Sequence, residues 1–143
     1  MSNDNGTEVR PLYNEHMASQ TLLLTYVLFV FFVFVHTLED IACDIFSLTL
    51  GGHQIGKNRY LFGATMMTTL NLGTLALLIA GLRAGFYLGL FTSAIIGVFQ
   101  AVVHMIGFIR AGRKMRGLGA GFYSAIPLAM VGAAVFVRIL SEL

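Results

Sequence analysis

Residues 21–38 read TLLLTYVLFVFFVFVHTL, an apolar stretch without Asp, Glu, Lys or Arg. A helix needs about 20 consecutive apolar residues to cross a hydrocarbon core about 30 Å thick. Three further stretches of this kind follow, at about 60–82, 85–109 and 118–140, and the first can continue past Asp44. The sequence therefore predicts an all-α protein, a four-transmembrane-helix bundle.

The composition places most of the chain in lipid. Hydrophobic residues make up 57% of the 143 residues and charged residues only 11%, whereas a soluble domain carries about 25% charged residues. None of the four stretches has the continuous polar face of a helix in a soluble bundle. The net charge of +2 is too small for a nucleic-acid-binding surface. The lipid bilayer is the expected partner, and nucleic acid is not.

Two further features limit the chemistry and the domain organisation. Cys43 is the only cysteine, which excludes an intramolecular disulfide and a CxxC motif. The first 20 residues are polar and lack the basic region that precedes a secretory signal core. We therefore expect a polar N-terminal tail over residues 1–20 and a four-helix transmembrane domain over residues 21–143.

The basic residues predict an orientation in the cell membrane. The first and third loops carry six of the nine Lys and Arg residues: Lys57, Arg59, Arg110, Arg113, Lys114 and Arg116. Cytoplasmic loops of membrane proteins are enriched in Lys and Arg. We expect a multi-pass protein with the first and third loops in the cytoplasm and both termini external.

The third stretch carries small residues at every fourth position: Gly85, Gly89, Ser93, Gly97 and Ala101. Small residues at this spacing let helix backbones approach closely in lipid. This stretch should be central in the bundle, or bind a membrane protein partner or a second copy of the chain through the same face. At 100° per residue, Gln100 and His104 point to the same packed side, away from lipid.

Ionisable residues gather near the end of the first stretch. His36, Glu39, Asp40 and Cys43 share one face of a continued helix through their i, i+3 and i+4 relations. Such groups at membrane depth are costly and usually mark function. His104 should lie at a similar depth, in the inner third of the bilayer. We expect His36, Glu39, Asp40 and His104 to form one buried site with catalytic or metal-binding roles.

Other polar side chains are expected to converge on the same site. They are Thr65, Thr68 and Asn71 of the second stretch and Tyr123 and Ser124 of the fourth. Simpler roles compete with this hypothesis. Glu39 and Asp40 can cap or solvate a helix end at the membrane surface, and an intramembrane histidine such as His104 is often only a hydrogen-bonded packing residue.

The segment His36-Thr37-Leu38-Glu39-Asp40, at the end of a first transmembrane helix, resembles the HXXEE family. The family consists of small integral membrane proteins of unestablished biochemical function. The resemblance assigns His36, Glu39 and Asp40 to the motif positions. Asp40 replaces the second Glu, which keeps the charge and shortens its reach.

Several functions fit these residues. Histidine and carboxylate groups at helical spacing can hold a transition metal, or move protons on a lipid-soluble substrate. His36 and His104 could instead be the axial ligands of a haem. A structural or accessory subunit of a larger membrane complex needs none of this chemistry, and a small transporter or channel would need oligomerisation. The sequence leaves open whether the protein is an enzyme.

Overall fold

The computed structural model describes residues 18–47, 49–50, 53–110, 112–113 and 119–143. Within these residues, four helical spans are long and apolar enough to cross a membrane, which confirms the four-helix bundle. The spans are α1 (Gln20–Ala42), α2 (Lys57–Ile79), a third span over Arg83–Arg110 and α5 (Phe122–Glu142). The predicted tail falls largely on residues 1–17, outside the described residues.

The third span is continuous but changes its helix type in the middle. It consists of α3 (Arg83–Thr92), the π-helix η2 (Ser93–Phe99) and α4 (Gln100–Arg110). A π-helix forms i→i+5 hydrogen bonds and therefore has more residues per turn than an α-helix. The constant 100° per residue that the sequence suggested is wrong across this segment, and Gln100 and His104 reach the interior from a shifted register.

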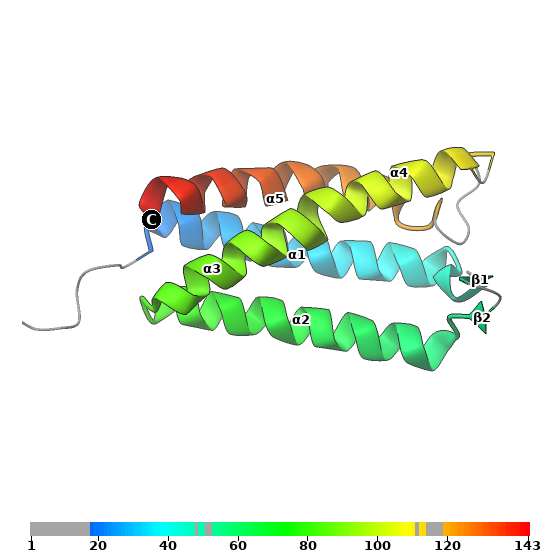
Figure 1. Cartoon of the computed structure of the whole chain (residues 1–143), viewed down its shortest axis with the longest axis horizontal. Coiled ribbons are helices and arrows are strands. Elements are labelled where there is room, and N and C mark those ends of the chain that lie inside the picture. The colour runs from blue at the N-terminus through cyan, green and yellow to red at the C-terminus, as the bar shows by residue number, and fades with distance from the viewer. Residues whose placement is uncertain (1–17, 48, 51–52, 111, 114–118) are drawn as a thin grey trace, which may run out of the picture.

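The connection between α1 and α2 holds a short 3₁₀ turn, η1 (Ile45–Ser47). It also holds two antiparallel strands of two residues each, β1 (Thr49–Leu50) and β2 (His53–Gln54). The C-terminal ends of α1 and α4 and the N-terminal ends of α2 and α5 lie at the same end of the bundle, which we call the loop end (Figure 1). The turn from α2 to α3 and the C-terminus lie at the opposite end, the terminal end.

The third span crosses the bundle diagonally (Figure 1). Near the terminal end α3 packs on α2, whereas towards the loop end η2 and α4 pack on α5. α1 lies between, in contact with both α5 and α2. As a result the third span diverges from α2 as it approaches the loop end.

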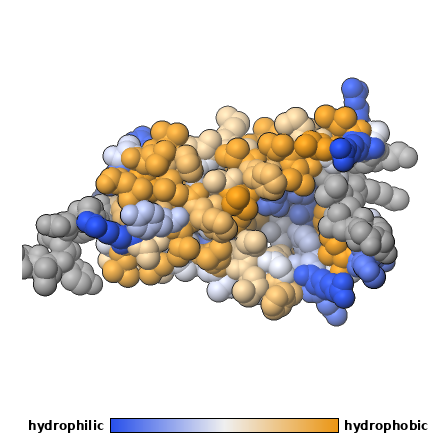
Figure 2. All heavy atoms as spheres, viewed as in Figure 1, coloured by the Kyte–Doolittle hydropathy of each residue, from blue (hydrophilic) through white to orange (hydrophobic). Residues whose placement is uncertain are grey.

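Apolar side chains cover the outside of the bundle. Figure 2 shows hydrophobic residues over most of the visible surface, with hydrophilic residues near the two ends. Large exposed residues such as Phe31, Phe62, Phe91 and Met130 would be unfavourable in water. Lipid removes this cost, so the exposed surface agrees with a multi-pass membrane protein.

Two helix boundaries differ from the expected ones. α1 ends at Ala42 and does not continue past Asp44, because Asp44 adopts a left-handed backbone conformation with φ of 57°. α5 begins at Phe122 and not near residue 118, because Gly121 is also left-handed, with φ of 71°. Glycine adopts this conformation without the steric cost that other residues incur.

The stripe of small residues faces other helices of the same chain. A Cβ atom on Gly97 would lie 2.9 Å from the Cα atom of Gly132 in α5, and one on Gly85 would lie 2.7 Å from the backbone nitrogen of Leu78 in α2. The third span is therefore central, as the spacing predicted. Use of the same face by a partner stays a prediction.

Replacing Gly97 by Ala should destabilise the bundle by about 1–3 kcal/mol, the cost of overpacking a close contact. The measurement is the free energy of unfolding in mixed detergent micelles with increasing denaturing detergent. Gly73→Ala is the matched control, because a Cβ atom on Gly73 meets nothing within 4 Å. Equal stability of the two variants would contradict this account of the η2–α5 contact.

Candidate functional site

Three buried side chains meet near the loop end of the bundle. His36 and Asp40 lie one turn apart on α1, and His104 reaches them from α4. Their exposed fractions are 3%, 3% and 4%. One ligand atom from each lies within 4.8 Å of the other two. The structure therefore brings together three of the four residues predicted for the site.

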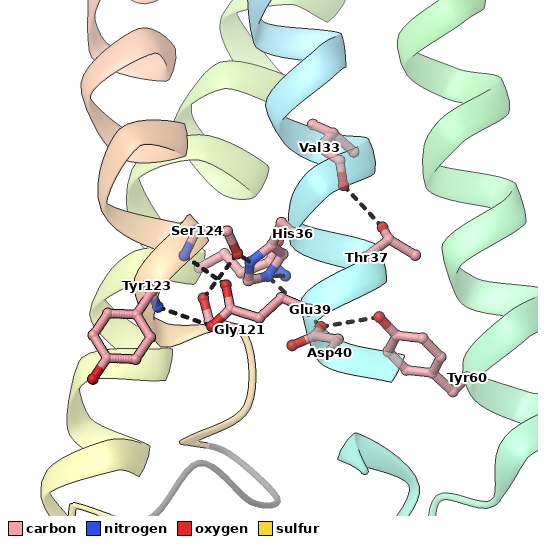
Figure 3. Close-up of polar contacts among 10 residues, drawn as sticks. Val33, His36, Thr37, Glu39, Asp40, Tyr60, Gly121, Tyr123 and Ser124 are labelled. Carbon is pink, nitrogen blue, oxygen red and sulfur yellow. Dashed lines mark hydrogen bonds and ion pairs between the residues drawn. The ribbon is translucent and has the colours of Figure 1, made fainter. Parts of the chain in front are cut away.

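Hydrogen bonds fix the ring of His36 (Figure 3). The hydroxyl of Ser124 donates its one hydrogen to the carbonyl oxygen of Gly121 at 3.2 Å, so it accepts a hydrogen bond from His36 Nδ1 at 3.0 Å. In the neutral ring the other nitrogen, Nε2, then carries the lone pair. This Nε2 accepts a hydrogen bond from the amide nitrogen of Gln100 at 2.7 Å and lies 3.7 Å from Oδ2 of Asp40.

Two buried atoms in the cluster have no hydrogen-bond partner among the described residues, Oδ1 of Asp40 and Nδ1 of His104. A buried polar atom without a partner costs about 1–3 kcal/mol. Gly121 packs directly against Asp40 and His36, since a Cβ atom there would collide with Asp40 Oδ1 and would lie 3.0 Å from His36 Nδ1. The cluster is closely packed yet incompletely bonded.

Glu39 lies apart from this group and caps α5. Its carboxylate accepts hydrogen bonds from the backbone N–H groups of Tyr123 at 3.1 Å and Ser124 at 2.7 Å (Figure 3). The first N–H groups of a helix have no intrahelical partner, and Gly121 at the N-cap has no side chain to offer. Glu39 fills this role from α1 and so holds Ser124 next to His36.

The cluster borders an open pocket on the side that faces α2. The hydroxyl of Tyr60, in the first turn of α2, donates to Oδ2 of Asp40 at 2.9 Å. Beside this contact lies a pocket of about 270 Å³ between α1, α2, η2 and the start of α4, and His36, Asp40 and Gln100 line it. In Figure 2 hydrophilic atoms are visible in a hollow between α4 and α2, where the third span has diverged.

The other predicted contributors divide between this site and a second one. Ser124 joins the cluster, but the side chain of Tyr123 is exposed and Thr65 lies on the outer face of α2. Asn71 instead accepts a hydrogen bond from the hydroxyl of Tyr26 at 3.2 Å, nearer the terminal end. The expectation that all these residues converge is wrong for Tyr123, Thr65 and Asn71.

Two residues of the site were missed in the sequence, Gly121 and Tyr60. The glycine-rich stretch before α5 was a usable signal for Gly121, because a left-handed glycine often precedes a close backbone approach. The contact from Tyr60 to Asp40 had no local signal. It depends on how α2 is rotated against α1.

The donor set fits a divalent transition metal. Two imidazoles and one carboxylate are ligands of zinc and of non-haem iron. Ligand atoms in a tetrahedral zinc site, with bonds of about 2.0–2.1 Å, lie roughly 3.3 Å from one another. The present separations, within 4.8 Å, are larger, so a bound metal would have to draw the ligand atoms together and replace the amide of Gln100 at His36 Nε2. Ser124 would support His36 from its other ring nitrogen, as outer partners of metal ligands do.

A haem does not fit the same residues. Axial imidazoles bind the iron from opposite faces of the macrocycle. The rings of His36 and His104 instead contact each other directly, with centroids 4.6 Å apart and planes at 86°. The macrocycle would have to separate two rings that are already packed.

Comparisons of the chain with protein-family models, with curated proteins and with solved structures found no match, so the resemblance to the HXXEE family stays a prediction from the sequence.

Replacing Glu39 by Ala should lower the free energy of unfolding by about 0.5–2 kcal/mol, the usual cost of losing an N-cap. Glu39→Gln should cost less, because its amide oxygen still accepts one of the two backbone hydrogen bonds. Unfolding in mixed micelles measures both. A role of Glu39 in ligand binding alone would leave the stability of both variants unchanged.

Proposed function

We propose that this protein binds a divalent transition-metal ion inside the membrane, with His36, Asp40 and His104 as its ligands. The observation that carries the proposal is a pair of buried atoms without hydrogen-bond partners among the described residues, Asp40 Oδ1 and His104 Nδ1. They belong to a group in which one ligand atom of His36, Asp40 and His104 lies within 4.8 Å of the others. A cation bound there would give Asp40 and His104 the partner they lack, and it would replace the amide of Gln100 at His36 Nε2.

Three protein ligands leave a metal ion with an open coordination position, where it can activate water or polarise a substrate. The basic first and third loops support placing this site in the cytoplasmic third of the bilayer, with both termini external. A function as a metal-dependent enzyme follows more readily from this arrangement than one as a purely structural subunit, because the pocket gives a substrate access to His36 and Asp40.

The same pocket supports a second candidate, acid–base chemistry on a lipid-soluble substrate without a metal. Tyr60, Asp40 and His36 form a connected row of proton-carrying groups along its wall. General acid–base catalysis needs such groups within hydrogen-bond reach of a bound substrate. Metal binding distinguishes the two candidates.

The purified, tag-free protein in detergent should bind one zinc ion per chain, measured by elemental analysis after dialysis. Cobalt(II) in its place should give the visible absorption of a protein-bound ion. Replacing His36, Asp40 or His104 by Ala should weaken zinc binding by roughly 100-fold or more, since even outer-partner changes cost about 10–100-fold. Ser124→Ala should weaken zinc binding by only about 10–100-fold, because Ser124 is an outer partner of His36.

His53→Ala is the matched control, because His53 lies exposed in β2, and it should bind zinc as the wild type does. Zinc binding that is lost equally in His53→Ala would assign the ion to the surface. A wild-type protein without any tight zinc or iron binding would remove the metal proposal and leave the acid–base candidate.

A further inference from the structure

The pocket beside the cluster is polar at one end and apolar at the other. Arg59, Tyr60 and Asp40 line it near the loop end, and Val33, Met67 and Ile96 line it deeper in the bundle. Arg59 and Met67 are eight residues apart on α2, which corresponds to about 12 Å along the helix axis. The gradient therefore follows the direction in which a membrane lipid changes from headgroup to chain.

The charge at the polar end is positive and available. Arg59 is exposed and forms no ion pair with the residues that the structure describes. The carboxylate of Asp40 lies close by, but it is hydrogen-bonded to Tyr60 and belongs to the proposed metal site. A guanidinium group with free donors is a strong ligand for phosphate and carboxylate groups.

The size of the pocket limits what it holds. Its volume of about 270 Å³ corresponds to roughly nine water volumes of about 30 Å³ each. That is enough for a small headgroup and a few methylenes, and it is below the usual range of pockets that enclose a drug-sized ligand. The remainder of a longer molecule would lie in the bilayer, past the exposed residues Gly63 and Met67 of α2.

We infer that this pocket binds an anionic amphiphile, a lipid whose headgroup carries a phosphate or a carboxylate, with Arg59 holding the anion and Val33, Met67 and Ile96 holding the first part of the chain. The inference names the substrate class of the proposed metal site and rests on that proposal, because the metal neutralises Asp40. Without it, the carboxylate would repel the headgroup. The anion would then lie beside His36 and Asp40.

The glycine at position 63 allows a direct test. It lines the pocket, and a Cβ atom built on it meets nothing within 4 Å. Gly63→Leu therefore adds a side chain at the pocket wall, and its Cβ atom has no close neighbour in the fold. Gly73→Leu is its matched control, since Gly73 is on the same helix, has equally open surroundings and does not line the pocket.

The experiment measures binding of three single-chain lipids to the zinc-loaded protein by native mass spectrometry: oleoyl lysophosphatidate, oleate and monoolein. The two anionic lipids should bind with one molecule per chain and about tenfold more tightly than neutral monoolein, the effect of one charge-assisted hydrogen bond. Arg59→Gln should remove this preference, and Lys57→Gln should keep it. Gly63→Leu should abolish binding, and Gly73→Leu should not.

Each comparison of lipids or variants has an outcome that supports or overturns the inference. Binding of lysophosphatidate alone would assign the pocket to lipid phosphates, and equal binding of oleate would assign it to anionic amphiphiles in general. Equal binding of monoolein, or unchanged binding by Gly63→Leu and Arg59→Gln, would overturn the inference. Zinc content measured on the same samples separates the proposals. Bound zinc without anion preference refutes only the lipid site, whereas a protein that takes up no zinc refutes the metal site and the lipid site that rests on it.

Discussion

The backbones of η2 and α5 approach each other at Gly97 and Gly132, where neither residue has space for a β-carbon. In lipid, helices gain little from the hydrophobic effect when they associate, so close backbone packing supplies much of the stabilisation. The contact draws α5 onto the third span, and the loop end of α5 then lies over α1. Ser124 reaches His36 for this reason, while α4 brings Gln100 to the other side of the same ring.

Two buried polar clusters within the described residues show how differently such groups can be used. The hydroxyl of Tyr26 bonds to Asn71 and Thr92, and Asn71 also donates to a backbone carbonyl, so this cluster satisfies itself. It joins three spans and needs no ligand. The cluster of His36, Asp40 and His104 instead keeps two buried atoms, Asp40 Oδ1 and His104 Nδ1, without a hydrogen-bond partner among the described residues. That difference is the physical reason for assigning function to one cluster and structure to the other.

Adjacent carboxylates on α1 have separate roles because successive helical residues point about 100° apart. Glu39 turns towards α5 and bonds to its free N–H groups, which places Gly121 and Ser124 above the site. Asp40 turns towards α2 and α4, where it contacts Tyr60 and lines the pocket. Glu39 therefore positions residues of the site, and Asp40 is one of its members.

The sequence by itself determined the four spans, because span length and hydropathy are local properties. The small residues also predicted that the third helix is central, and the depth of His36, Asp40 and His104 predicted that these side chains lie close together. Only the tertiary structure decided that Glu39 caps α5 and that the third span changes register through η2. The pocket likewise depends on the tertiary structure. These features depend on how each helix is rotated and crosses its neighbours, and side-chain packing between distant segments sets that geometry.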